Sequence, residues 1–206
     1  MYIFRILFLV IAITSICSNS LAQTATDYNE YAKLKLDSGE YVESIIACDM
    51  AIQKNPDTKI AYFTRGMANY ALKQDKPAVS DLTVFLKKYP EAYLLLYFRG
   101  KSKFRLGDYR GAVSDLEKYS RLYQDGLTSE CFIMLAKSRS FLYDYTPAIR
   151  DYTSAIKLDS ESSEAFYGRG LCKMILKQKN SACMDFSRAG ELGYEKAYTI
   201  IRDYCN

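Results

Sequence analysis

The side chains that could do chemistry in this sequence are cysteines, carboxylates and lysines, because its 206 residues contain no histidine. Without histidine, Ser-His and Cys-His nucleophiles cannot form, and the commonest metal ligand is missing. The six cysteines include no C-x-x-C pair, so the usual zinc and redox signatures are absent as well. General acid and base chemistry by Asp and Glu is therefore the remaining catalytic option.

The aspartates stand at recurring places rather than in one cluster. Asp108 and Asp115 are each followed by a second aspartate 36 residues later, at Asp144 and Asp151. Recurrence in several copies indicates helix caps and solvent-facing positions, whereas a catalytic pair would occur once. The sequence therefore predicts a protein that is not an enzyme, with no catalytic residue, no metal and no cofactor.

A pattern of residue sizes predicts the elements that position these side chains. An aromatic residue or Leu is followed by a large residue three places later and a small one four places later. The small residues are Ala32, Gly66, Gly100, Ala136 and Gly170, spaced by 34, 34, 36 and 34 residues. Another small residue comes twelve places after each, and a bulky one four places after that. These spacings predict pairs of helices that approach closely at the small residues.

The recurring pattern resembles the tetratricopeptide repeat, a helix-turn-helix unit of 34 residues. The segments LGDYRGAVSDL, at 106–116, and DYTPAIRDYTSAIKLD, at 144–159, match it best. The resemblance implies an all-α, right-handed α-solenoid of five helix-turn-helix repeats that forms one continuous domain over 23–206. The repeats are expected near 25–58, 59–92, 93–126, 129–162 and 163–196, and a capping helix is expected at 195–205.

The first 22 residues have the order of a secretory signal peptide. Arg5 precedes an apolar run over 6–16, and small residues stand three and one places before a cut after Ala22. These eleven apolar residues are too few for a membrane span, which needs about 20. We therefore expect an exported protein, periplasmic or secreted, with no membrane span after cleavage. An uncleaved anchor and a lipoprotein with its lipid on Cys17 are the alternatives.

Removal of residues 1–22 takes away one basic residue, which leaves 27 basic and 24 acidic residues and a net charge of +3. A balance of this kind does not favour a nucleic acid or an anionic membrane as the partner. The predicted partner is therefore a protein or a peptide.

Two of the five cysteines in the exported chain are placed for a disulfide. Cys183 lies near the start of the second helix of repeat five, and Cys205 lies near the end of the capping helix. These helices should run antiparallel, so both thiols face one seam, and an exported protein can form the bond. Cys172 with Cys183 is the competing pair, and a chain in which every thiol is free is the third alternative. We expect the bond between Cys183 and Cys205.

Three arginines, Arg65, Arg99 and Arg169, recur beside the small packing residues. They could form a ladder that grips acidic groups of a partner. Their place favours a structural role instead, with the aliphatic stem packed between helices and the guanidinium paired to a neighbouring carboxylate.

The resemblance assigns the inner face of the solenoid to the first helix of each repeat, and this face is the predicted binding surface. Places five, nine and twelve share one helical face; of these fifteen residues, ten are apolar or aromatic, three are lysines and none is acidic. The predicted groove residues are Phe63, Met67, Tyr70, Tyr97, Lys101, Phe104, Ile133, Lys137, Tyr167 and Leu171. The twelfth places could instead pack between helices.

The carboxylate clamp with which members of this family hold C-terminal tails is missing here. Recognition is expected to rest on aromatic and Met contacts, with Lys adding weak selection for acidic groups. The prediction is an exported scaffold or adaptor that holds a peptide segment or protein partner in its concave groove. A chaperone-like holder or accessory subunit for envelope or secreted proteins is the alternative. An enzyme of the cysteine-rich helical-repeat group fits poorly, because only the last repeat has two cysteines.

Overall fold

The computed structural model describes residues 24–123 and 127–205, and every regular element in these ranges is a helix. The predicted signal peptide, at 1–22, lies outside the described residues. The elements are α2 (Ala25–Asp37), α3 (Tyr41–Lys54), α4 (Lys59–Ala71), α5 (Asp75–Lys88), α6 (Leu94–Arg105), α7 (Tyr109–Leu122), α8 (Ser129–Phe141), α9 (Tyr145–Leu158), α10 (Ser163–Ile175), α11 (Lys179–Glu191), α12 (Glu195–Ile200) and η1 (Ile201–Cys205). The prediction of an all-α helical-repeat fold is confirmed, while the handedness and the domain bounds stay predictions.

The described residues divide into two compact units between Ala68 and Asn69, inside α4. In the first unit, α2 packs against α3 around small buried side chains that include Ala47 and Ala51. Ser44 donates a hydrogen bond of 2.8 Å from its Oγ to the backbone carbonyl of Ala32. The small residues at both places therefore let the two helices approach closely, as their spacing predicts.

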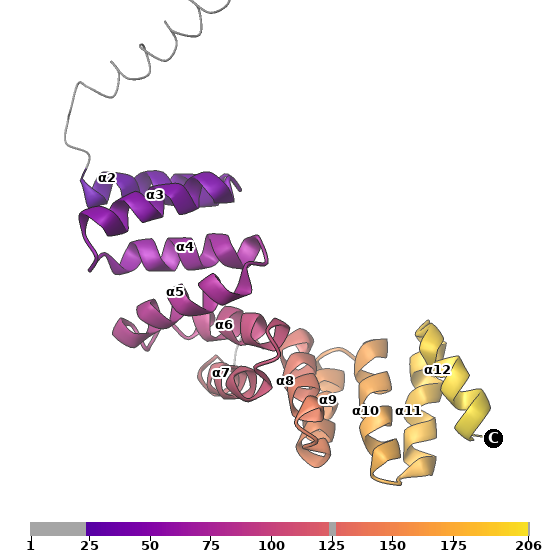
Figure 1. The fold of residues 1–206 in the computed structure, drawn as a ribbon. Coiled ribbons are helices and arrows are strands. Elements are labelled where there is room, and N and C mark those ends of the chain that lie inside the picture. The colour runs from indigo at the N-terminus through magenta and orange to yellow at the C-terminus, as the bar shows by residue number, and fades with distance from the viewer. Residues whose placement is uncertain (1–23, 124–126, 206) are drawn as a thin grey trace, which may run out of the picture. The chain divides into compact units, whose positions relative to one another are not determined.

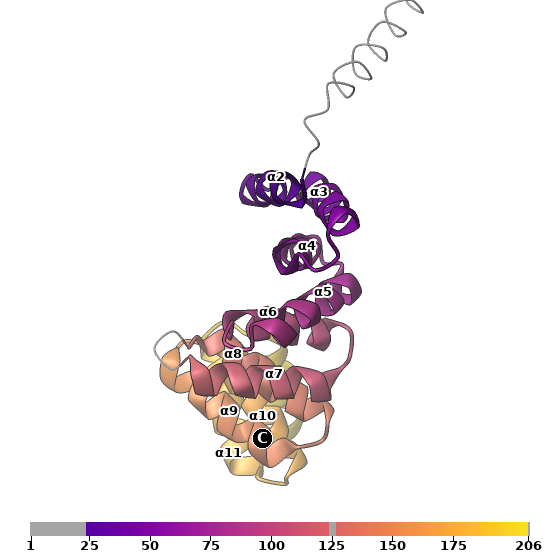
Figure 2. The same cartoon turned by 90° about the vertical axis from the view of Figure 1, so that its left-hand side faces the viewer.

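In the second unit, consecutive helices pack side by side from α6 to α11. Figure 1 shows α8, α9, α10 and α11 as a row of helices that alternate in direction, and Figure 2 gives the view turned by 90°. A Cβ atom on Gly170 would lie 2.7 Å from the ring of Phe186, and one on Gly100 would lie 3.0 Å from Leu116. The predicted small and bulky places are thus direct packing partners.

The turn between the two helices of a repeat needs one residue in the left-handed region of the backbone. Gly107 has a φ of +79° at this place, which costs glycine little. Tyr143 takes the equivalent place after α8 with a φ of 64°, and Lys73 takes it after α4 with a φ of 58°. A side chain strains the backbone in this region. Repeats without glycine at this place therefore form the same turn, and the strained backbone lowers their stability.

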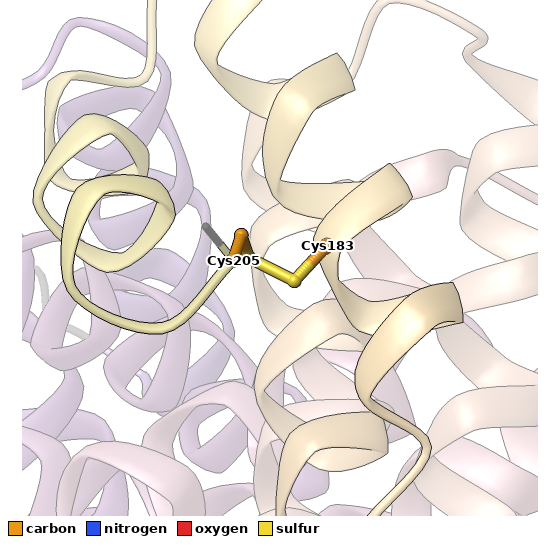
Figure 3. The surroundings of a disulfide bond; sticks show 2 residues. All are labelled: Cys183 and Cys205. Carbon is orange, nitrogen blue, oxygen red and sulfur yellow. A yellow bond between two sulfur atoms is a disulfide. The ribbon is translucent and has the colours of Figure 1, made fainter.

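A disulfide ties the C-terminal end of the chain to α11. Cys183 on α11 and Cys205 at the end of η1 are bonded, with an S–S distance of 2.03 Å and 5.6 Å between the Cα atoms (Figure 3). This is the pair expected from the sequence, and Cys172 of the competing pair is a buried thiol. The cap buries Ala197 in a cluster with Phe186 of α11. The expected capping helix is α-helical over α12 and π-helical over η1.

Candidate functional site

Two of the recurring arginines form ion pairs inside the fold. Arg99 binds both carboxylate oxygens of Asp115, with Nε and Nη2 donating at 2.7 and 2.6 Å. Arg169 binds Asp185 in the same way, at 2.9 and 2.7 Å. Both aspartates are buried. A bidentate pair of this kind fixes one helix of a repeat to the other, so the structural interpretation of these arginines is supported.

Repeat four holds its buried aspartate in a different way. Leu135 stands at the arginine's place, and Asp151 forms an ion pair with Arg139 instead. Arg139 also pairs with Glu117 of α7, so two carboxylates share its charge. Burial raises the pKa of Asp151 to about 6, although Arg139 acts to lower it. The carboxylate of Asp151 therefore helps to hold helices together, and its pKa lies close to neutral pH.

The lysines of the predicted inner face are paired with glutamates. Lys101 Nζ lies 2.6 Å from a carboxylate oxygen of Glu130, and Lys137 forms an ion pair with Glu164. Both glutamates lie in the first turn of the next repeat's first helix, α8 or α10. The hydrogen bond from Lys101 lowers the pKa of Glu130. The fifteen counted places carry no acidic residue, but that count omitted the start of the next repeat's first helix, where these two glutamates lie.

Two other predicted groove residues serve packing between helices. Ile133 is 8% exposed and belongs to the core cluster around Tyr152, so its predicted place in the groove is corrected to the core. The reason is that α8 contacts α6, α7, α9 and α10, which leaves little of its surface free. Tyr70, at a twelfth place, packs edge-on against Phe98 with 5.0 Å between ring centres. This is the alternative that the sequence left open for the twelfth places.

Three further predicted residues lie elsewhere on the first helices. Phe63 and Met67 are half-buried on α4 in the first unit. Tyr97 lies on α6, where its ring packs against Tyr119 with 5.4 Å between centres. Burial raises the pKa of Tyr97 well above its usual range, and Glu130 adds to the effect. Binding by these three residues stays a prediction.

Four predicted groove residues border one pocket in the second unit. Phe104 of α6, Lys137 of α8, and Tyr167 and Leu171 of α10 line a pocket of about 440 Å³. The rest of the wall is not among the predicted residues: Ser140, Phe141, Tyr145, Tyr152, Glu164, Gly168, Cys172, Ile175 and Tyr194. The lining is mostly aromatic and aliphatic, and the volume lies within the range of known ligand sites.

The pocket opens where two facing places on α8 and α10 hold small residues. In repeats two and three, the twelfth place of one repeat and the sixth of the next hold Tyr70 and Phe98, whose rings fill the space. The same places in repeats four and five hold Ser140 and Gly168. Without a side chain on Gly168, the ring of Tyr152 can approach: a Cβ there would lie 2.3 Å from Tyr152 Cζ. Two small residues at these places are the sequence signal that could have located the pocket.

The pocket has a polar but uncharged floor. Ser140 donates from Oγ to the backbone carbonyl of Ala136 at 2.8 Å, and the same oxygen lies 3.2 Å from Cys172 Sγ. Burial raises the pKa of the Cys172 thiol, so it stays protonated at neutral pH. Burial also raises the pKa of the Tyr152 phenol far above its usual range. The floor offers hydrogen-bonding groups without an activated nucleophile.

The rim of the pocket carries aromatic and aliphatic side chains that remain exposed. Phe141 stacks on Tyr109 with 4.4 Å between ring centres, yet it is 54% exposed. Tyr143 is 78% exposed, and its ring centre lies 6.3 Å from that of Tyr145, which lines the pocket. Ile175 is also exposed. Exposed apolar side chains gathered beside a pocket are typical of protein interaction sites.

In residues 24–123 and 127–205, neither the side chains nor the helices have the arrangement that a metal site or a membrane span needs. No three His, Cys, Asp or Glu side chains of these residues are grouped so that they could hold a metal ion. No helix in the same part of the chain has the length and apolar character of a membrane span.

Known proteins share the repeat and the fold. Residues 60–92 match the sequence model of the tetratricopeptide repeat family. The structure is similar to that of YrrB, described as a TPR protein with an unusual peptide-binding site, with a TM-score of 0.79 and 16% identity over 91% of this chain and 97% of YrrB. It is also similar to MamA from Desulfovibrio magneticus RS-1, with a TM-score of 0.70 and 17% identity over 84% of this chain and 97% of MamA. No curated protein sequence matches the chain.

At these identities the structural likeness concerns the fold alone. The sequence match identifies residues 60–92 as one such repeat. The remaining helix pairs follow the same spacing of small and bulky residues. The chain therefore contains a tetratricopeptide repeat at residues 60–92 and shares the helical-repeat fold of these neighbours.

Proposed function

We propose that this protein is a scaffold that binds a peptide segment or protein partner at the pocket bordered by α6, α8 and α10. The observation that carries the proposal is the pocket of about 440 Å³, which opens on the first helices of repeats three to five. Its lining is mostly apolar, with a few polar groups at the floor, as is usual for recognition sites. The exposed aromatic rim extends this surface beyond the pocket.

The proposal includes export through the signal peptide at 1–22. The order of residues in that segment supports it, and so does the disulfide between Cys183 and Cys205, because such bonds persist in oxidising compartments. The N-terminus of the protein recovered from its native host should be Gln23. A chain that retains Met1 and reduced Cys183 would contradict export.

Binding is tested with a double variant of the pocket wall. Tyr167→Ala with Leu171→Ala removes two lining side chains from α10. Met184→Ala with Tyr198→Ala removes two exposed side chains that do not line this pocket and serves as the control. Each tagged protein is cross-linked in host cells and purified, and its partners are quantified by mass spectrometry. Circular dichroism checks that both variants remain helical.

The scaffold proposal expects one partner in fixed stoichiometry with the wild type and the control variant, and its loss with the pocket variant. Equal recovery of that partner by all three proteins would refute the pocket as the binding site. Many substoichiometric partners would instead indicate a chaperone-like holder for envelope or secreted proteins.

A further inference from the structure

We propose that the pocket receives a single uncharged aromatic side chain of the partner, and that the small residues Ser140 and Gly168 create this specificity. The inference rests on the proposed function and goes further, because it names the chemical group that the partner inserts. It is built on the shape of the pocket, its charge, and the exposed side chains of its rim.

The shape of the pocket favours an aromatic group. Repeats two and three fill the equivalent space with their own rings, those of Tyr70 and Phe98, packed edge-on at 5.0 Å. In repeats four and five, the smaller Ser140 and Gly168 stand at these places and line the pocket, with the ring of Tyr152 against Gly168. Tyr167 and Phe104 also line the pocket. A ring from a partner would restore the aromatic packing that the chain itself supplies one step earlier. An aliphatic side chain would lack the ring-to-ring contacts with Tyr167 and Phe104.

The charge of the pocket favours an uncharged group. Lys137 and Glu164 are the charged residues among those that line it, and they form an ion pair with each other. Neither charge is left to neutralise a charged side chain of the partner. A carboxylate or ammonium group placed here would lose hydration without gaining an opposite charge. A partner that presents a neutral ring avoids this cost.

An exposed aromatic residue, Tyr143, stands beside the pocket at a strained turn of the kind that Lys73 and Lys177 also hold. Tyr143 has a φ of 64°, a conformation that strains any residue with a side chain, and it is 78% exposed. Gly107 holds the equivalent turn in repeat three without strain. The ring of Tyr143 lies next to Tyr145 on the pocket wall. Its position suits contact with residues that flank the inserted side chain.

The test uses random dodecapeptides displayed on phage and selected on the immobilised full chain with its disulfide intact. Selected peptides are synthesised, and their Kd values are measured for the wild type and for two variants. Ser140→Phe fills the pocket with the residue type that repeat three carries at this place, Phe104. Ser154→Phe is the matched control, because both hydroxyls bond to the carbonyl four residues earlier and Ser154 does not line the pocket.

We expect the selected peptides to share one aromatic residue, and its change to Ala to weaken binding about tenfold or more. Ser140→Phe should weaken binding by a similar factor, whereas Ser154→Phe should leave the Kd within about twofold. If Ser140→Phe does not fold, Leu171→Ala in the pocket wall replaces it, with an expected loss of about fivefold.

Three results would overturn the inference. Peptides without a shared aromatic residue, or peptides that bind the wild type and the pocket variant equally, would show that peptide binding occurs without this anchor. A library that yields no peptide above background would overturn the inference together with the proposed function.

Discussion

Protonation of Asp151 should stabilise the fold, in contrast to the usual behaviour of a carboxylate in an ion pair. Burial raises its pKa from the ordinary 3.8 to about 6, so the folded chain binds this proton more tightly than the unfolded chain does. The free energy of unfolding should therefore increase as the pH falls through 6 and level off below 3.8. Its contribution is absent well above the folded pKa, where both states are ionised.

The size of the effect follows from the difference between the two pKa values. A difference of about two units corresponds to about 3 kcal/mol, of which about 2 kcal/mol is gained between about pH 7.5 and about pH 4. Asp151→Asn removes the titrating group, and Arg139 keeps its second partner, Glu117. The difference in unfolding free energy between the wild type and Asp151→Asn should thus grow by about 2 kcal/mol toward acid pH.

Urea unfolding followed by circular dichroism, at pH steps across this range, measures that difference. Asp115→Asn is the variant for comparison with Asp151→Asn. Asp115 occupies the same place in repeat three, but both Arg99 and Lys103 form ion pairs with it. At neutral pH Asp115→Asn should lower the free energy of unfolding by about 3 kcal/mol, since it leaves two cations without their carboxylate. A wild-type advantage over Asp151→Asn that stays constant or shrinks toward acid would refute the reasoning.

Three further predictions concern single features of the fold. Cys205→Ser opens a loop with a sequence separation of 22 and should lower the free energy of unfolding by about 3 kcal/mol; non-reducing peptide mapping that finds Cys205 as a free thiol would contradict the bond. Tyr143→Gly should raise the free energy of unfolding by about 1 kcal/mol, because glycine adopts the left-handed turn without strain, and a destabilised variant would show that the exposed ring supports the fold. Gly170→Ala should lower the melting temperature, because the new Cβ would lie 2.7 Å from the ring of Phe186; an unchanged melting temperature would mean that this contact can relax.

The helix pairs could be predicted because both partners of each packing contact recur at fixed places in the sequence. A small residue such as Gly170 and a bulky one such as Phe186 recur at fixed spacing, and the structure puts them in contact. The pairing of Cys183 with Cys205 follows from the same geometry, since adjacent antiparallel helices bring the start of one to the end of the other. These features depend on spacing along the chain.

The parts that could not be predicted depend on what neighbouring helices supply. Lys137 looks like a free cation on its own helix, but Glu164 of the next repeat pairs with it. Ile133 lies on the predicted face, yet α8 is enclosed on several sides and buries it. The pocket needs small residues at two places 28 positions apart, Ser140 and Gly168, and neither is unusual by itself.

Photo-cross-linking from the mouth of the pocket would show whether a partner binds there. A photo-reactive amino acid is placed at Ile175, which lines the pocket and is 54% exposed, or at Met184, which is 74% exposed and does not line it. Binding at the pocket predicts a discrete cross-linked partner from position 175 that disappears when Ser140→Phe is added, and none from position 184. Equal cross-linking from both positions, or cross-linking at 175 that persists in the filled pocket, would contradict it.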